Sequence, residues 1–97
     1  MKGRERAALR ADAHHLSPTV HVGKEGLSAS LITSLDDTLR THELVKVKLG
    51  KEAPESREDT AATLSSRTSS AVAQTLGRTI LFYRRHPKKP RIVLPNE

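Results

Sequence analysis

The 97-residue sequence contains no cysteine, which excludes disulfide bridges and thiolate zinc sites. The five histidines do not replace them, because His14 and His15 are adjacent and point different ways on a helix, and the others lack helical metal-ligand spacing. No apolar run reaches the roughly 18 residues that span a bilayer, and residues 1–10 lack the apolar region of a signal peptide. We therefore expect a protein of the reducing cytoplasm, without membrane contact, metal or cofactor, whose fold depends on ordinary burial.

Aromatic residues are almost absent, since Phe82 and Tyr83 are the only two. Modules that bind single-stranded nucleic acid stack bases on several rings, so recognition by stacking is not expected. We assign Phe82 to the core, and Tyr83 either to packing at the core edge, which we favour, or to one stacking ring. The sequence also lacks a P-loop, a G-x-G-x-x-G motif and a recognised nucleophile setting. It predicts neither an enzyme nor a site for a small-molecule substrate.

What the sequence does have is positive charge at both ends. Seventeen Lys and Arg face eleven Asp and Glu, which gives a net charge of +6 and a pI near 10.2. Residues 1–15 carry four basic and two acidic side chains, residues 16–77 carry seven and eight, and residues 78–97 carry six and one. This asymmetry predicts salt-dependent binding of a polyanion through the two ends of the chain.

Hydrophobic periodicity and capping signals divide the chain into seven elements. Leucines at every fourth position from Leu27 to Leu39 mark one face of a helix, and the stripe of Leu9, Ala13 and Leu16 marks another. The spacing S-x-x-D that begins at Ser56 predicts a helix start. The predicted helices span 4–16, 28–41 and 57–69, and the predicted strands span 19–22, 43–49, 71–76 and 79–84.

The resulting order, α-β-α-β-α-β-β, predicts one α/β domain over residues 1–97, with a core at about 5–85 and a basic extended tail at 86–97. Strands joined through a helix are expected to be parallel neighbours with right-handed crossovers, and the last two strands to form an antiparallel hairpin around Gly77-Arg78. We thus expect a four-stranded mixed sheet packed with three helices in two or three layers. Residues 91–95 could dock on the sheet or on a helix.

Two local patterns could bind phosphate. Gly23-Lys24-Glu25-Gly26 lies between a strand and a helix, where two glycines allow close backbone approach and the helix start offers amide donors. A G-x-x-G loop clamps nucleic-acid backbone in KH domains, although two such glycines can equally form a plain turn. In the strand 43–49, Lys46 and Lys48 alternate with apolar residues, so they share a face that is either solvated, bound to a ligand or covered by the first helix.

Three longer stretches occur in a specific order. They are 16–26 (LSPTVHVGKEG), 42–48 (HELVKVK) and 77–84 (GRTILFYR), and their order and spacing resemble the CRM family, the chloroplast RNA splicing and ribosome maturation domains. The resemblance covers about residues 5–95. It implies a fold similar to the C-terminal domain of the third bacterial translation initiation factor, and binding of structured RNA. The standalone bacterial members, the YhbY-type proteins, are associated with precursors of the large ribosomal subunit.

The resemblance makes ribosomal RNA in the large-subunit precursor (pre-50S) the expected partner of a monomeric protein that contacts the RNA backbone. An alternative is a protein-interaction module whose basic ends dock on an acidic ribosome-associated protein. The residues expected to contact RNA are the loop residues Gly23, Lys24, Glu25 and Gly26 and the basic residues Lys2, Arg4, Arg6, Arg10, Lys46, Lys48, Arg78, Arg84, Arg85, Lys88 and Lys89.

Two features depart from the family pattern. Glu25 places a carboxylate beside Lys24, which weakens the attraction of the loop for phosphate. Relatives often have glycine near the end of the third helix, where this chain has Thr68-Ser69-Ser70. The loop hypothesis predicts that Gly23→Asp or Gly26→Asp weakens RNA binding without unfolding the protein.

Overall fold

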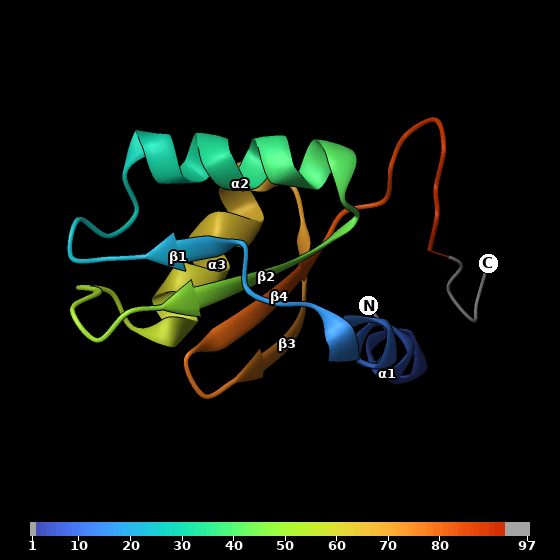
Figure 1. Cartoon of the computed structure of the whole chain (residues 1–97), viewed down its shortest axis with the longest axis horizontal. Helices are drawn as coiled ribbons and strands as arrows, with labels where there is room; N and C mark the ends of the chain where they lie inside the picture. Colours follow the sequence, from blue (N-terminus) through green and yellow to red (C-terminus); the bar gives the residue numbers. More distant parts are fainter. Residues whose placement is uncertain (1, 93–97) are drawn as a thin grey trace.

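A computed structural model describes residues 2–92 of the protein, and the predicted order of elements is confirmed (Figure 1). A short 3-10 helix after α1 is an addition to that order. The elements are α1 (Gly3–Asp12), the 3-10 helix η1 (Ala13–His15), β1 (Val20–Val22), α2 (Ala29–Thr41), β2 (Leu44–Leu49), α3 (Arg57–Thr68), β3 (Ala71–Leu76) and β4 (Thr79–Tyr83).

The four strands form one mixed sheet in the order β1-β2-β4-β3. β1 and β2 are parallel neighbours as predicted, and β3 and β4 form the predicted antiparallel hairpin. The expectation that β2 and β3 are neighbours is wrong, because β4 lies between them and pairs antiparallel with β2. β4 is apolar on both faces, and Ile80, Leu81 and Phe82 are all buried, whereas β3 ends in exposed residues. The central position therefore goes to the strand that needs cover on both faces.

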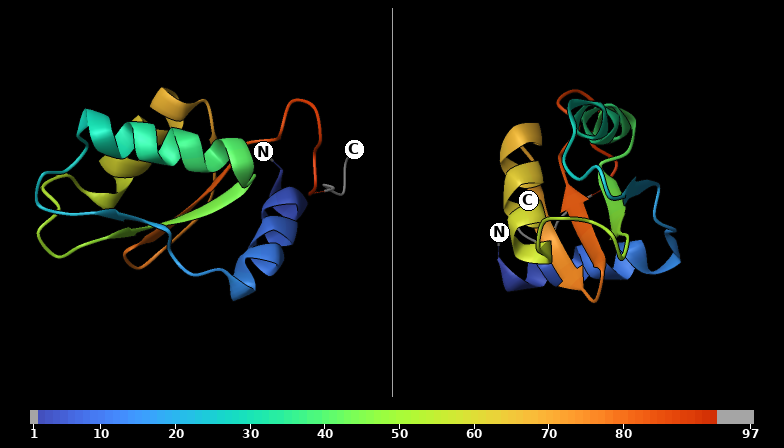
Figure 2. Two further views of the ribbon diagram at one scale, coloured as in Figure 1. Left: turned by 45° about the horizontal axis from the view of Figure 1, so that its top comes forward. Right: turned by 90° about the vertical axis from the view of Figure 1, so that its left-hand side faces the viewer.

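The molecule has three layers, with α2 and α3 on one face of the sheet and α1 on the other (Figure 2). Alternation along β2 directs Val45, Val47 and Leu49 toward α2 and α3, where they meet Leu35 and Leu64. This larger cluster also contains Phe82, as predicted.

The smaller cluster lies beneath α1. Leu9 and Ala13 pack against Leu44, Leu81 and Tyr83, so Tyr83 is a packing residue of the sheet face that α1 covers. The predicted third member of the α1 stripe is wrong: Leu16 is 38% exposed. α1 ends at Asp12, and the chain is already extended at Leu16 on its way to β1.

Helix ends follow local signals. The Oγ atom of Ser28 accepts a hydrogen bond from the N–H of Leu31 (3.1 Å), and Ser56 Oγ accepts one from Asp59 (3.0 Å), as N-caps do. α3 ends at Thr68 and is capped by Ser69, which has a left-handed backbone with φ of 53°. The departure from glycine at this position therefore places an ordinary side chain in a conformation that favours glycine.

Candidate functional site

The Gly23–Gly26 loop closes as a tight turn directly before α2. The N–H of Gly26 donates to the carbonyl of Gly23 (3.0 Å), and the N–H of Ser28 donates to the carbonyl of Gly26 (3.0 Å). Lys24 and Glu25 lie exposed at its tip. The turn thus presents one cation and one carboxylate side by side to an incoming ligand.

The two glycines of this loop have different surroundings. Gly26 is buried with φ of +67°, and a Cβ atom there would lie 2.8 Å from Cγ of Pro54 and 2.6 Å from a carboxylate oxygen of Glu55. Gly23 is exposed, has no positive φ, and a Cβ atom would meet nothing within 4 Å. We therefore expect Gly26→Asp to destabilise the fold, whereas Gly23 can change without a clash.

Neighbouring loops brace this end of the sheet. The N–H of Gly50 donates to the carbonyl of Val22 (2.8 Å), and that of Leu49 to the carbonyl of Arg78 (2.7 Å). The guanidinium of Arg78 donates to the carbonyl of Gly50 (3.2 Å). Arg78 is nevertheless exposed, so the predicted cation of the β3–β4 hairpin reaches the end of the sheet that carries the glycine loop.

This glycine-loop end is not strongly basic. Its cations are Lys24, Lys48, Lys51, Arg57 and Arg78, and the acidic residues of the same loops and the first turn of α3 are Glu25, Glu52, Glu55, Glu58 and Asp59. Lys51 was not among the predicted contacts, although its place directly after Gly50 in a charged loop was a signal. The equal number of opposite charges means that shape and backbone donors must contribute to any phosphate binding here.

The two lysines of β2 share a face, as predicted, but differ in surroundings. The ammonium of Lys46 donates to the carbonyls of Leu16 (2.9 Å) and Ala13 (3.3 Å), which holds the end of η1 against the sheet. Lys48 is exposed and lies beyond the cover of α1, next to His21 in the sheet register. Of the two, only Lys48 is placed as a predicted ligand contact should be.

Arg84 binds other parts of the protein itself. Its guanidinium donates to the carboxylate of Asp36 (2.7 Å), to the carbonyl of Asp36 (3.0 Å) and to the carbonyl of Thr68 (2.7 Å). The hydrogen bond and charge of Arg84 lower the pKa of Asp36 below its ordinary value, against a smaller opposing effect of burial. These contacts join β4 to α2 and α3, which favours a structural role over the predicted RNA contact.

The remaining predicted cations lie at the opposite end of the molecule. Arg4, Arg6 and Arg10 are exposed on α1, as is Lys2 before it. The segment after β4 exposes Arg85, Lys88 and Lys89, and also Arg91, which the predicted contacts did not include. Ile92 packs against the cluster beneath α1, so part of the predicted docking of the tail is confirmed, while residues 93–95 lie outside the described residues.

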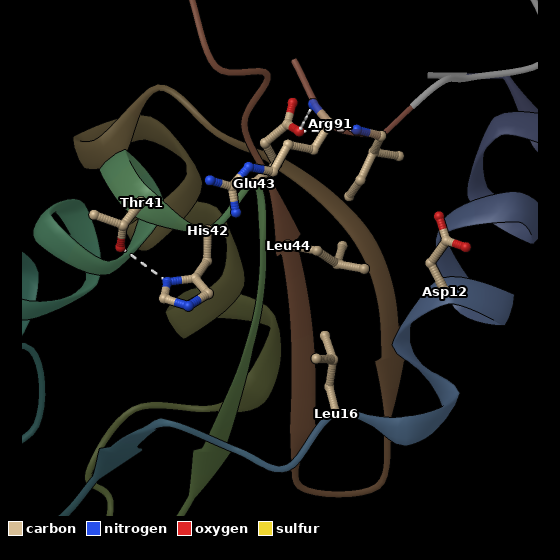
Figure 3. Close-up of a pocket in the computed structure, with 8 residues that line it drawn as sticks. Asp12, Leu16, Thr41, His42, Glu43, Leu44 and Arg91 are labelled. Carbon is tan, nitrogen blue, oxygen red and sulfur yellow. Dashed lines mark hydrogen bonds between the residues drawn. The ribbon is translucent and has the colours of Figure 1, made fainter. Parts of the chain in front are cut away.

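Glu43, at the start of β2, is a buried acidic residue that the sequence analysis missed. It is 6% exposed and lines a pocket between β2, α1 and the tail (Figure 3). Its burial, which alone would raise the pKa, is outweighed by hydrogen bonds from the backbone of His86, Arg91 and Ile92, so the pKa is lowered overall. The only available signal was a carboxylate at the start of an apolar strand.

Residues 2–92 show neither a membrane-spanning helix nor a metal-binding cluster. None of their helices has the length and apolar character needed to cross a membrane. Within the same residues, no three His, Asp or Glu side chains gather closely enough to hold a metal ion.

The fold and these two ends define a small α/β domain with cations displayed on loops and on one helix. The family model of the CRS1 / YhbY (CRM) domain matches residues 1–84. The chain therefore belongs to the CRM family.

Two relatives and one solved structure match this chain over nearly its full length. The chain is 34% identical over 95 residues to Probable RNA-binding protein YqeI of Bacillus subtilis, covering 98% of this chain and 99% of that protein. It is 30% identical over 94 residues to a protein of Haemophilus influenzae named RNA-binding protein, covering 97% and 94%. The solution structure of hypothetical protein SAV1595 from Staphylococcus aureus matches with a TM-score of 0.83 at 34% identity, covering 98% and 99% of the two chains.

Proposed function

We propose that this protein binds RNA through the phosphate backbone, and that its RNA is ribosomal RNA in the large-subunit precursor. The observation that carries the proposal is the near full-length similarity to relatives that are named RNA-binding proteins. These relatives are described by binding and not by a reaction, so the chain is a binding protein rather than an enzyme.

The geometry supports backbone contact over base stacking. Both aromatic side chains are buried in the core, so neither offers a ring to a base. The exposed groups are Lys24 in the glycine loop, Lys48 and Arg78 beside it, and the cations of α1 and the tail. Such groups bind phosphate with little sequence information and release counterions as they do so.

The test compares Gly23→Asp with Thr33→Asp. Both changes add one carboxylate at an exposed position, but Thr33 lies in the second turn of α2 and outside the glycine loop. We expect Gly23→Asp to weaken RNA binding while Thr33→Asp binds as the parent does, and both to remain folded. Equal binding by all three proteins would contradict the role of the loop.

The cellular partner is tested by sedimentation and crosslinking. We expect the tagged protein to travel with large-subunit precursors in a sucrose gradient, to crosslink to large-subunit ribosomal RNA near Gly23, and to leave the particle after RNase digestion. A protein that stays at the top of the gradient without crosslinked RNA would refute the ribosomal assignment. Retention on a protein partner after digestion would favour the acidic-protein alternative.

A further inference from the structure

The chain after β4 is fastened to the start of β2 by one side chain, the carboxylate of Glu43. One carboxylate oxygen accepts the N–H of His86 (3.0 Å), and the other accepts the N–H of Ile92 (2.9 Å) and the N–H of Arg91. Figure 3 shows the carboxylate of Glu43 turned toward the backbone of Arg91. A single buried anion thus closes residues 86–92 into a loop.

A second set of contacts shapes the loop between these anchors. Nδ1 of His86 accepts the N–H of Lys88 (3.1 Å) and the N–H of Lys89 (2.9 Å). The backbone donors of the loop therefore point inward, to His86 and Glu43. The side chains of Lys88, Lys89 and Arg91 are exposed, so the loop displays three cations within four residues.

This cation loop, residues 86–91, lies far from the glycine loop. The longest extent of the molecule is 38 Å, and the two loops occupy opposite ends of that axis in Figure 1, where the β1–α2 connection is at the left and the segment after β4 at the right. α1, with its own exposed arginines, lies on the side of the cation loop. Unlike the glycine-loop end, this end has an excess of cations.

We propose that Glu43 is a positioning residue that holds Lys88, Lys89 and Arg91 as a second contact for the RNA backbone, opposite the glycine loop. The inference rests on the proposed function, because it assumes that the ligand is RNA. A buried carboxylate needs hydrogen-bond partners, and here those partners are backbone groups of the loop itself. By accepting these N–H groups, the carboxylate of Glu43 orders the loop that carries the three cations.

The first test is Glu43→Gln, because a pure charge effect and a positioning role of Glu43 predict opposite changes in RNA affinity. Removing a carboxylate from a polyanion-binding protein should by itself strengthen binding. If Glu43 positions the loop, the variant weakens binding instead, because the amide group of glutamine cannot accept the N–H bonds that one carboxylate oxygen now accepts. The matched control is Asp12→Asn, since Asp12 is exposed on α1 across the same pocket and loses the same charge.

The second test is the double variant Lys88→Glu with Lys89→Glu. Loss of two phosphate contacts should reduce the slope of log K against log salt by about 2. With a slope of about 0.9 per phosphate contact, each contact raises the affinity about fivefold when the salt is lowered from 1 M to 0.15 M. At 0.15 M salt we therefore expect the double variant to lose roughly thirtyfold in RNA affinity. Glu43→Gln should lose at least about threefold and lower the slope in the same direction, without reaching the double variant.

The probe is an RNA hairpin with a stem of about 16 base pairs, the length that double-stranded RNA-binding domains span, and a second hairpin with half that stem. We expect the cation-loop variants to weaken binding of the long hairpin more than that of the short one, because only the long stem reaches both ends. Backbone amide NMR should show altered His86, Arg91 and Ile92 signals in Glu43→Gln, with the rest of the spectrum unchanged.

The outcomes separate this inference from the proposed function. A parent protein that binds neither hairpin would refute both. Parent binding that Gly23→Asp weakens, while Glu43→Gln and the lysine variant leave it unchanged, would refute the second contact alone. Tighter binding by Glu43→Gln, equal to that of Asp12→Asn, would show that its charge matters and its position does not. If the lysine variant releases only a protein partner and no RNA, the cation loop is a protein-docking site and the proposal is wrong.

Discussion

The two glycines of the loop should respond in opposite ways to the same small change, a single added methyl group. In Gly26→Ala the new Cβ has to occupy a left-handed backbone, which costs an ordinary residue about 1–2 kcal/mol. It also lies 2.8 Å from the ring of Pro54 and 2.6 Å from the carboxylate of Glu55. The carboxylate is flexible and can move away, but the proline ring is not, so crowding adds about 1–2 kcal/mol.

The sum, about 2–4 kcal/mol, is a large part of the stability of a small domain. For a domain of this size it corresponds to a melting temperature lower by roughly 10–25 °C. Gly23→Ala meets no atom within 4 Å and has no positive φ, so its main effect is to restrict the unfolded chain. We expect its free energy of unfolding to stay level or to rise by up to about 1 kcal/mol, with the melting temperature following in the same direction.

Thermal and urea unfolding followed by circular dichroism measures both variants under the same conditions. If Gly26→Ala melts within 3 °C (about 0.5 kcal/mol) of the parent, the loop does not pack on Pro54 as described. If Gly23→Ala loses as much stability as Gly26→Ala, the distinction between the two glycines is wrong. RNA binding by Gly26 variants has to be measured well below their lowered melting temperature.

Three further results are expected from the same assays. Ser69→Gly should raise the free energy of unfolding by about 0.5–1 kcal/mol because it removes the strain of a side chain in a left-handed backbone after α3. Ser66→Gly, inside the helix, should lower the free energy of unfolding by about 0.5 kcal/mol. A loss of stability in both variants would contradict the assigned helix end. The fold lowers the pKa of Asp36, so the ionised carboxylate stabilises the protein above the ordinary aspartate pKa of about 3.9, and this contribution is lost as the pH falls through the lower folded value. Asp36→Asn should therefore be less stable at pH 7 and should lose less stability between about pH 4 and 2. If parent and variant lose the same stability in acid, this assignment is refuted. Lys46→Met should lower the free energy of unfolding by about 1–2 kcal/mol because it leaves two carbonyls without their ammonium donor, and it should change the salt slope of RNA binding little. Lys48→Met should lower that slope by about 1 at unchanged stability. The reverse pattern would exchange their assigned roles.

Local sequence signals predicted much of the fold because they act within a few residues of the chain. The leucine spacing of α2, the caps at Ser28 and Ser56, and the alternation along β2 each determine an element and the side of it that is buried. The short loop at Gly77 forces the last two strands to pair with each other. None of these signals identifies the other surface that the buried side meets, so the insertion of β4 beside β2 was missed.

The roles of the charged residues were less predictable, because they depend on partners distant in sequence. Arg84 is bound to Asp36, 48 residues away, and Lys46 to carbonyls 30 and 33 residues away. In sequence they look like any other cation of a basic protein. Lys88 and Lys89, by contrast, are exposed as predicted, and only the order of the loop that carries them depends on Glu43.

The sequence by itself determined the elements, their order, the family and the excess of positive charge, because periodicity, capping and composition are properties of neighbouring residues. Tertiary structure decided which strand lies at the centre, which motif glycine is held by packing, and which cations face outward. It did so because burial and pairing depend on surfaces that meet only when the chain folds. Glu43 illustrates the difference: its place at the start of a strand is local, but its ability to order the tail exists only after β2 and the chain beyond β4 lie side by side.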